Sequence, residues 1–161
     1  MIQKTKTLKY MGKAPSWKLA GHDSRVYAQH HYTWSMNLVV VFFRSATAVH
    51  DQEQMREFNA QLGTAENYNT QVIGVIPAPV EELAQVHKEL ELKFPLLSDV
   101  ERRVATHYGL VAGLLFGKYT RPTVLVEDKY NVIYFLSIAE KDDERVAWAA
   151  VEDVLKRFPR R

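Results

Sequence analysis

Residues 37–43, Asn37-Leu-Val-Val-Val-Phe-Phe43, are the stretch that decides the fold of this chain. The run is continuous, apolar and rich in β-branched and aromatic side chains, which is typical of a central strand covered on both faces. A short polar turn follows at residues 44–49, and from His50 the apolar residues recur at helical spacing. The stretch therefore predicts a buried strand that leads through a turn into a helix, with Gly63 as the C-cap of that helix.

The same patterns predict the remaining elements. Strands are expected at residues 71–76, 123–127 and 132–136, a β-hairpin at 16–28, and helices after Pro79, after an N-cap at Asp99, and along 147–158 with Asp142 or Asp143 as the cap. Strands separated by helices need crossovers and pair in parallel, whereas the last two strands form an antiparallel hairpin. This order predicts an α/β fold with a mixed central sheet, helices on both faces and an N-terminal β-hairpin, in one domain of residues 1–161.

Composition excludes several classes of function. The 161 residues contain no cysteine, which removes disulfides, thiolate catalysis and thiolate metal ligands. The net charge is +2 without a long basic run, so no nucleic-acid partner is expected. No apolar run approaches the ~20 residues that span a bilayer, and residues 1–9 lack an apolar signal core. We expect a cytoplasmic protein with no membrane partner.

Several short motifs together resemble the peroxiredoxin family, that is, the alkyl hydroperoxide reductase and thiol-specific antioxidant group. The matching pieces are Gly12-Lys-Ala-Pro-Ser-Trp-Lys-Leu19, Phe94-Pro-Leu-Leu-Ser-Asp99, Val104-Ala-Thr-His-Tyr-Gly-Leu110 and Arg121-Pro-Thr-Val124. The second and third are similar to the single-domain, bacterioferritin-comigratory branch. Their order and spacing cover about residues 10–157 and imply a thioredoxin-like fold.

The resemblance also implies where a reactive site would lie. Thr47, His50 and Glu53 fall on the family signature Thr-x-x-Cys-x-x-Glu, and Arg121 falls on the active-site arginine. His50 therefore stands in the position of the peroxidatic cysteine, and Phe43 in that of the signature proline. The resolving cysteine, where family members have one, has no counterpart.

These replacements change the chemistry that the family resemblance implies. Peroxide reduction begins with a thiolate that attacks the O–O bond and becomes a sulfenic acid, and imidazole has no comparable reversible oxidation. We therefore predict no thiol peroxidase activity from this chain alone. One hypothesis is a binding or regulatory module. The other is an antioxidant oxidoreductase that works through a partner's thiol or a bound cofactor.

The predicted site itself allows more than one interpretation. Thr47, His50 and Arg121, converging at a helix N-terminus, would favour a small anion, a carboxylate or an oxidised ligand. Alternatively, the site is inherited scaffold filled by His50 and Phe43. A metal site at His50 with His30-His31 and a general-base role for His50 are weaker alternatives. We expect no metal and no cofactor.

Residues 111–119 are apolar for a connecting segment. They are expected to be buried core, a flap over the site, or part of a dimer interface. The family resemblance makes a homodimer reasonable, with Leu114–Phe116 and Phe43 as its candidate contacts.

Overall fold

The computed structural model describes residues 1–113 and 115–159. Its elements, in chain order, are β1 (Lys18–Gly21), β2 (Val26–Ala28), the 3-10 turn η1 (Gln29–His31), β3 (Asn37–Phe42), α1 (Val49–Asn59), α2 (Leu62–Asn67), β4 (Thr70–Ile76), α3 (Val80–Glu89), β5 (Leu96–Ser98), α4 (Arg103–His107), β6 (Val111–Ala112), β7 (Tyr119–Thr120), β8 (Thr123–Glu127), β9 (Ile133–Ile138) and α5 (Trp148–Leu155).

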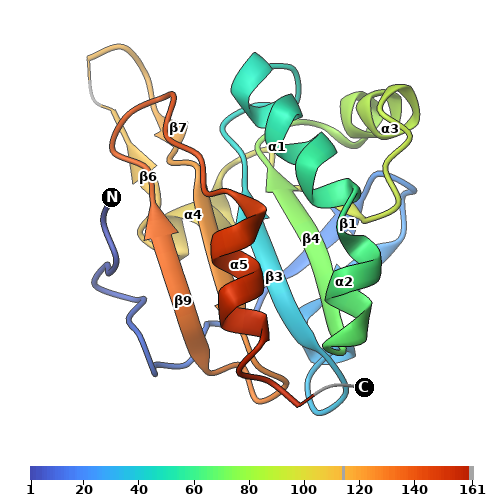
Figure 1. The fold of residues 1–161 in the computed structure, drawn as a ribbon. Helices are drawn as coiled ribbons and strands as arrows, with labels where there is room; N and C mark the ends of the chain where they lie inside the picture. Colours follow the sequence, from blue (N-terminus) through green and yellow to red (C-terminus); the bar gives the residue numbers. More distant parts are fainter. Residues whose placement is uncertain (114, 160–161) are drawn as a thin grey trace.

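The predicted mixed sheet is confirmed. Its seven strands run in the order β2-β1-β5-β4-β3-β8-β9, with β3 near the middle (Figure 1). β3 pairs in parallel with β4 and antiparallel with β8, and β8 and β9 form the expected antiparallel hairpin. All six residues of β3 are buried, as its continuous apolar sequence predicts.

Alternation along β3 divides the interior into two cores, because successive strand residues point to opposite faces. Val39 and Val41 face the core covered by α1, α2, α3 and α5. Leu38 and Val40 face the second core, which α4 and the N-terminal segment cover. The sheet thus lies between two layers, with α1, α2 and α5 in front of it and α4 behind it in Figure 1.

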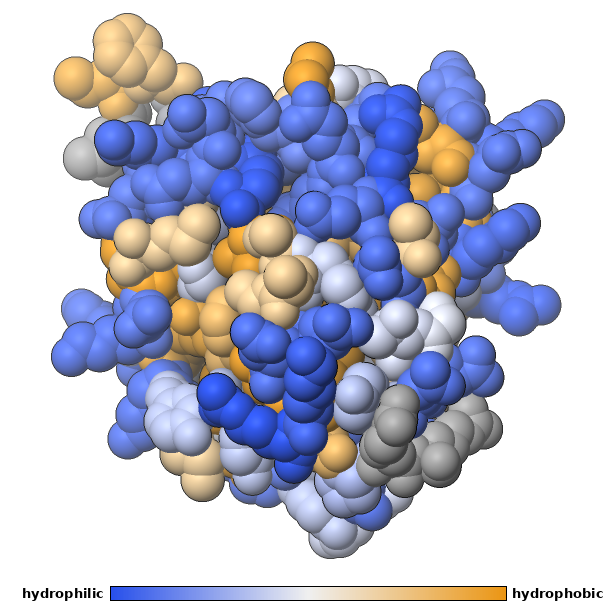
Figure 2. Space-filling model, in the orientation of Figure 1, coloured by the Kyte–Doolittle hydropathy of each residue, from blue (hydrophilic) through white to orange (hydrophobic). Residues whose placement is uncertain are grey.

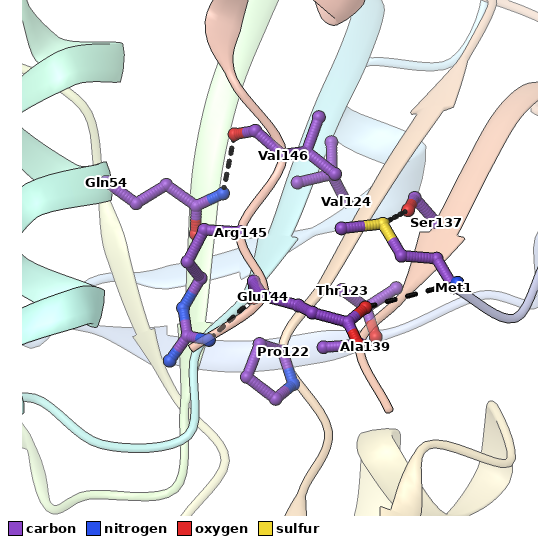
Figure 3. Close-up of a pocket in the computed structure, with 10 residues that line it drawn as sticks. All are labelled: Met1, Gln54, Pro122, Thr123, Val124, Ser137, Ala139, Glu144, Arg145 and Val146. Carbon is purple, nitrogen blue, oxygen red and sulfur yellow. Dashed lines mark hydrogen bonds and ion pairs between the residues drawn. The ribbon is translucent and has the colours of Figure 1, made fainter. Parts of the chain in front are cut away.

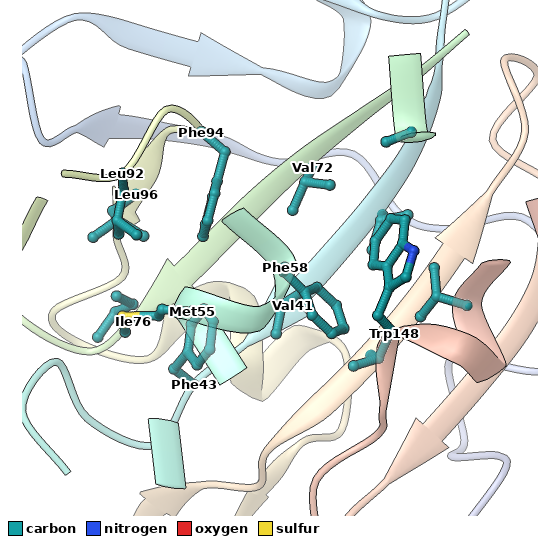
Figure 4. Close-up of a cluster of buried hydrophobic side chains, with 14 of the residues drawn as sticks. Val41, Phe43, Met55, Phe58, Val72, Ile76, Leu92, Phe94, Leu96 and Trp148 are labelled. Atoms are coloured by element: carbon teal, nitrogen blue, oxygen red, sulfur yellow. The ribbon is translucent and has the colours of Figure 1, made fainter. Parts of the chain in front are cut away.

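Phe43 corrects one prediction. Its side chain is fully buried in the larger core, near Met55 and Phe58 (Figure 4). A Cβ atom at residue 74 would lie 2.9 Å from the Phe43 ring, so Gly74 makes room for it. Phe43 is therefore available neither to a dimer interface nor to fill a pocket at the turn.

Several boundaries also differ from the predictions. α1 ends at Asn59, and Gly63 lies inside α2 instead of capping α1. Neither Asp142 nor Asp143 caps α5; its Trp148 N–H donates to the Glu57 carboxylate of α1 at 2.7 Å. β5 was not predicted, because its three residues gain their strand conformation from pairing with β4 and β1.

The apolar segment after α4 is a short hairpin of β6 and β7, not buried core. Leu115 and Phe116 are fully exposed at its tip, while Leu114 lies outside the described residues. The tip stands clear of the body at the upper left (Figure 2). Among the described residues, no helix is long and apolar enough to cross a membrane.

Candidate functional site

The turn between β3 and α1 is built around Ser45. Its hydroxyl accepts the backbone N–H groups of Ala48 at 2.9 Å and Thr47 at 3.2 Å, which closes the turn just before α1. Thr47 and His50 are both exposed beyond this turn. The predicted strand–turn–helix unit is confirmed, with Ala48 as the N-cap of α1 and Ser45 closing the turn that precedes it.

Asp51 stabilises the turn through its buried carboxylate. The side chain is fully buried, accepts the Ser45 N–H at 3.0 Å and forms an ion pair with Arg145 at 3.0 Å. The Arg145 side chain is itself only 11% exposed. Burial raises the pKa of the Asp51 carboxyl, and the Arg145 guanidinium opposes that rise. The pair ties α1 to the segment before α5.

This pair was missed by sequence reasoning, which assigned Asp51 only a favourable position in the helix dipole. A second missed contact is Arg44, whose guanidinium lies 4.2 Å over the Tyr119 ring and pairs with Asp142 at 3.0 Å. The only sequence feature that could have indicated these contacts is the position of Arg44 directly after the predicted strand. Both arginines bind the turn to segments distant in sequence.

The pocket beside His50 has a volume of about 200 Å³. The carboxylates of Glu53, Glu57 and Asp143 line it, and the His50 Nδ1 lies 3.9 Å from the Glu53 carboxylate. Arg145 also borders this pocket, but its charge is engaged by Asp51. The surroundings of His50 are therefore rich in acid, which disfavours an anion.

A neighbouring cavity lies between Gln54, β8 and residues 144–146 (Figure 3). It has a volume of about 10 Å³, the space of one water at most. The Gln54 amide donates to the Val146 carbonyl at 3.1 Å across it. This cavity is too small for a ligand.

Arg121 lies in a different pocket, of about 440 Å³, with Lys4 and Lys6. Its backbone N–H donates to the Leu110 carbonyl at 2.7 Å, which directs this stretch toward the end of α4. Within residues 1–113 and 115–159, no hydrogen bond or ion pair joins Arg121 to His50. Of the four residues of the predicted site, His50 and Glu53 line one pocket, Arg121 lines another, and Thr47 lines neither.

The histidines are dispersed over the fold. His30 and His31 lie in η1 before β3, whereas His50 lies after its far end. The described residues contain no group of three or more histidine or acidic side chains arranged to hold a metal. His22 and His87 form a separate stacked pair with ring centroids 3.5 Å apart.

A second buried carboxyl lies at the opposite end of the sheet. Glu127 pairs with Leu38 at the start of β3, is fully buried, and accepts a hydrogen bond from the Gln29 amide at 3.3 Å. Burial raises the pKa of Glu127 to about 8, and hydrogen bonds from Gln29 and Asn131 oppose that rise. No sequence signal marked this residue.

Comparison with known proteins finds one matching family and several similar structures. The AhpC/TSA family model matches residues 11–135. "Putative peroxiredoxin Rv2521" of Mycobacterium tuberculosis is 31% identical over 137 residues, covering 82% of this chain and 87% of that protein. The crystal structure of peroxidoxin BcpB from M. tuberculosis has a TM-score of 0.84 at 18% identity, covering 93% of this chain and 97% of the other. A thiol peroxidase from Chromobacterium violaceum has a TM-score of 0.82 at 19% identity, covering 96% and 90%. At these identities the structures establish the fold alone.

Proposed function

This chain belongs to the AhpC/TSA family, and on that premise we propose that it is a cysteine-free member that acts as a binding or regulatory module instead of a thiol peroxidase. The observation that carries the proposal is the absence of cysteine from all 161 residues of a chain that keeps the family fold. His50 stands where the family signature has its reactive sulfur. An imidazole cannot form the sulfenic acid that the reaction requires.

The surroundings of His50 support the same proposal. A reactive thiol is activated by nearby cations and a helix N-terminus, which lower its pKa. His50 instead has Glu53 at 3.9 Å, in a pocket that Glu57 and Asp143 also line. Arg121 belongs to the other pocket. The turn is held in a defined conformation, but among the described residues it lacks the uncompensated positive charge that would stabilise a thiolate.

The species bound would be a small anion or an oxidised ligand. Arg121 stands at the family's arginine position, and its pocket contains no carboxylate among the described lining residues. A guanidinium without an acidic partner favours carboxylate and phosphate groups.

The alternative is an antioxidant oxidoreductase that uses a partner's thiol or a bound cofactor. It is favoured by the 31% identity to a protein that carries the peroxiredoxin name. Peroxide consumption with dithiothreitol or thioredoxin discriminates the two. We expect the wild-type protein and its His50→Ala variant to be equally inactive. Turnover by the wild type well above the variant would overturn the binding-module proposal.

His50→Cys provides a companion test. Three carboxylates oppose a thiolate at this position, so we expect a thiol pKa close to the ordinary value of ~8.5 and slow reaction with peroxide. The pKa is measured from the thiolate absorbance as a function of pH. A strongly depressed pKa with rapid peroxide reduction would mean that the reactive site is intact.

We also propose a homodimer and a cytoplasmic location. Leu115 and Phe116 offer an exposed apolar contact for a second copy, since their side chains are fully accessible. Analytical ultracentrifugation of the wild type and Phe116→Ser tests the dimer, and we expect the variant to be monomeric. Cell fractionation tests the location.

A further inference from the structure

The pocket around Arg121 lies between the N-terminal segment and the end of α4. Its volume of about 440 Å³ falls in the range of small-molecule sites. Three cationic side chains line it, from Lys4, Lys6 and Arg121. They come from two parts of the chain more than a hundred residues apart in sequence.

Backbone contacts fix one wall of this pocket. Ile2 exchanges two backbone hydrogen bonds with Ile138, at 2.9 and 2.8 Å. The Thr5 hydroxyl donates to the Tyr108 carbonyl at 3.0 Å, and the Thr7 hydroxyl donates to the His107 carbonyl at 2.9 Å. Lys4 and Lys6 therefore alternate with anchored residues in a segment held at both ends.

Gly109 allows this segment to approach α4. It has a φ of +75°, and a Cβ there would lie 2.9 Å from the Thr5 Cβ. A side chain at residue 109 would therefore both strain the backbone and displace the segment. The pocket depends on a close approach that only glycine permits.

The charges in the pocket are not compensated within the described structure. Arg44, Arg103 and Arg145 each have a carboxylate partner. No ion pair is formed by Arg121, Lys4 or Lys6 among the described residues, and none of the residues that line the pocket is acidic. A concave surface with uncompensated cations concentrates anions.

The remaining lining is apolar or carries hydroxyl groups. Ile2, Val111 and Ile138 supply aliphatic surface, and Thr106 lies beside them. A ligand that satisfies both parts has a multiply charged anionic head and a small apolar body. Arginine binds phosphate through paired hydrogen bonds, while lysines contribute point charges.

We propose that this pocket binds a small organic phosphate with a short apolar group, a site that lies apart from the turn at His50. The proposal rests on the binding role proposed above and identifies the ligand class and the residues. Two negative charges on a phosphate monoester match the cations of Arg121, Lys4 and Lys6. The aliphatic wall adds affinity for the organic part.

The test is isothermal titration calorimetry with phenyl phosphate, inorganic phosphate and succinate. We expect saturable binding of phenyl phosphate, weaker binding of inorganic phosphate, and weakening of both by added salt. Arg121→Gln and the double variant Lys4→Gln/Lys6→Gln should each lower the affinity about tenfold or more. Lys88→Gln, on α3 outside the pocket, and His50→Ala should leave the affinity unchanged.

Thermal unfolding of each variant checks that the fold is kept. Absence of saturable phenyl phosphate binding, or equal loss in Lys88→Gln, would overturn the site. Loss of binding in His50→Ala would overturn the assignment of the site to the Arg121 pocket, and preference for succinate would overturn the phosphate class. A peroxidase activity would overturn the proposed function without affecting these binding results.

Discussion

Asp51 and Glu127 are both fully buried carboxyl groups, but only one of them has a cation beside it. Asp51, in the first turn of α1, pairs with Arg145 and accepts the Ser45 N–H. Glu127, at the other end of the sheet, has the Gln29 amide at 3.3 Å and forms no ion pair in the described structure. A buried carboxyl group is thus stabilised by an ion pair at one end of the sheet and by an amide hydrogen bond at the other.

The difference shows what holds the turn between β3 and α1 in place. A buried charge with its partner fixes geometry strongly, because removal of either member leaves the other uncompensated. A buried carboxyl group that is neutral and hydrogen-bonded to amides, such as Glu127, instead makes the stability of the fold depend on pH. The turn between β3 and α1 is therefore held by a contact in which His50 takes no part.

The largest expected effect is that of Arg145→Met. This change leaves the Asp51 carboxyl buried without its cation, so we expect a loss of roughly 3–5 kcal/mol in the free energy of unfolding. Urea denaturation measures it. The matched control is Arg103→Met, whose ion pair with Glu101 is exposed, and there the loss should be about 1 kcal/mol or less. Equal losses would show that the Asp51 pair has no special structural weight.

Glu127→Gln should change how stability depends on pH. The folded pKa of about 8 exceeds the reference value of 4.5, so the unfolded chain releases its proton first as pH rises. The stability that this group contributes to the wild type is present below pH ~4.5 and is lost as pH rises toward ~8, by roughly 3 kcal/mol between pH ~5 and ~7.

The glutamine variant lacks this titration, so its stability minus that of the wild type should increase across the same interval. Urea denaturation at several pH values gives the difference. A difference independent of pH would mean that Glu127 is ionised in the folded protein, as a group with a cation partner would be.

Ser45→Ala should have a smaller effect. It removes the hydroxyl that accepts the Ala48 and Thr47 N–H groups in the turn before α1, and we expect a cost of about 1 kcal/mol for the lost hydrogen bonds. Thr47→Ala is the matched control, because Thr47 is exposed and its backbone alone takes part in the turn. We expect that control to stay within about 0.5 kcal/mol. Thermal denaturation compares the two.

Much of the fold is readable from sequence because its signals are local. β3 and β4 contain the apolar runs 38–42 and 72–76, and the helices repeat their apolar residues at helical spacing. β5 carries no such signal, since its strand conformation comes from neighbours distant in sequence. The predicted helix caps at Gly63 and Asp142 were wrong because the contacts that decide these helix ends, such as that of Glu57 with Trp148, are tertiary.

The site is less predictable for the same reason. His50 and Glu53 lie one helical turn apart on α1, so their spacing places them side by side, whereas Thr47 lies in the turn before the helix. Arg121 comes from the far end of another connection, and its backbone bond to Leu110 sends it to a second pocket. The Asp51–Arg145 pair joins residues that no periodic pattern links. Both charged side chains are largely buried, whereas charged residues at the start of a helix are usually expected to be exposed.

The exposed hairpin tip has a consequence for limited proteolysis. Phe116 is fully accessible between two glycines, in a loop that projects from the body (Figure 2). Exposed loop tips are preferred sites of nicking, and an aromatic side chain is what chymotrypsin selects. Cleavage there would separate β8 and β9 from the preceding chain, yet β8 would stay hydrogen-bonded to β3 along five residue pairs. We therefore expect the two fragments of the cleaved protein to stay associated and to separate only in denaturant.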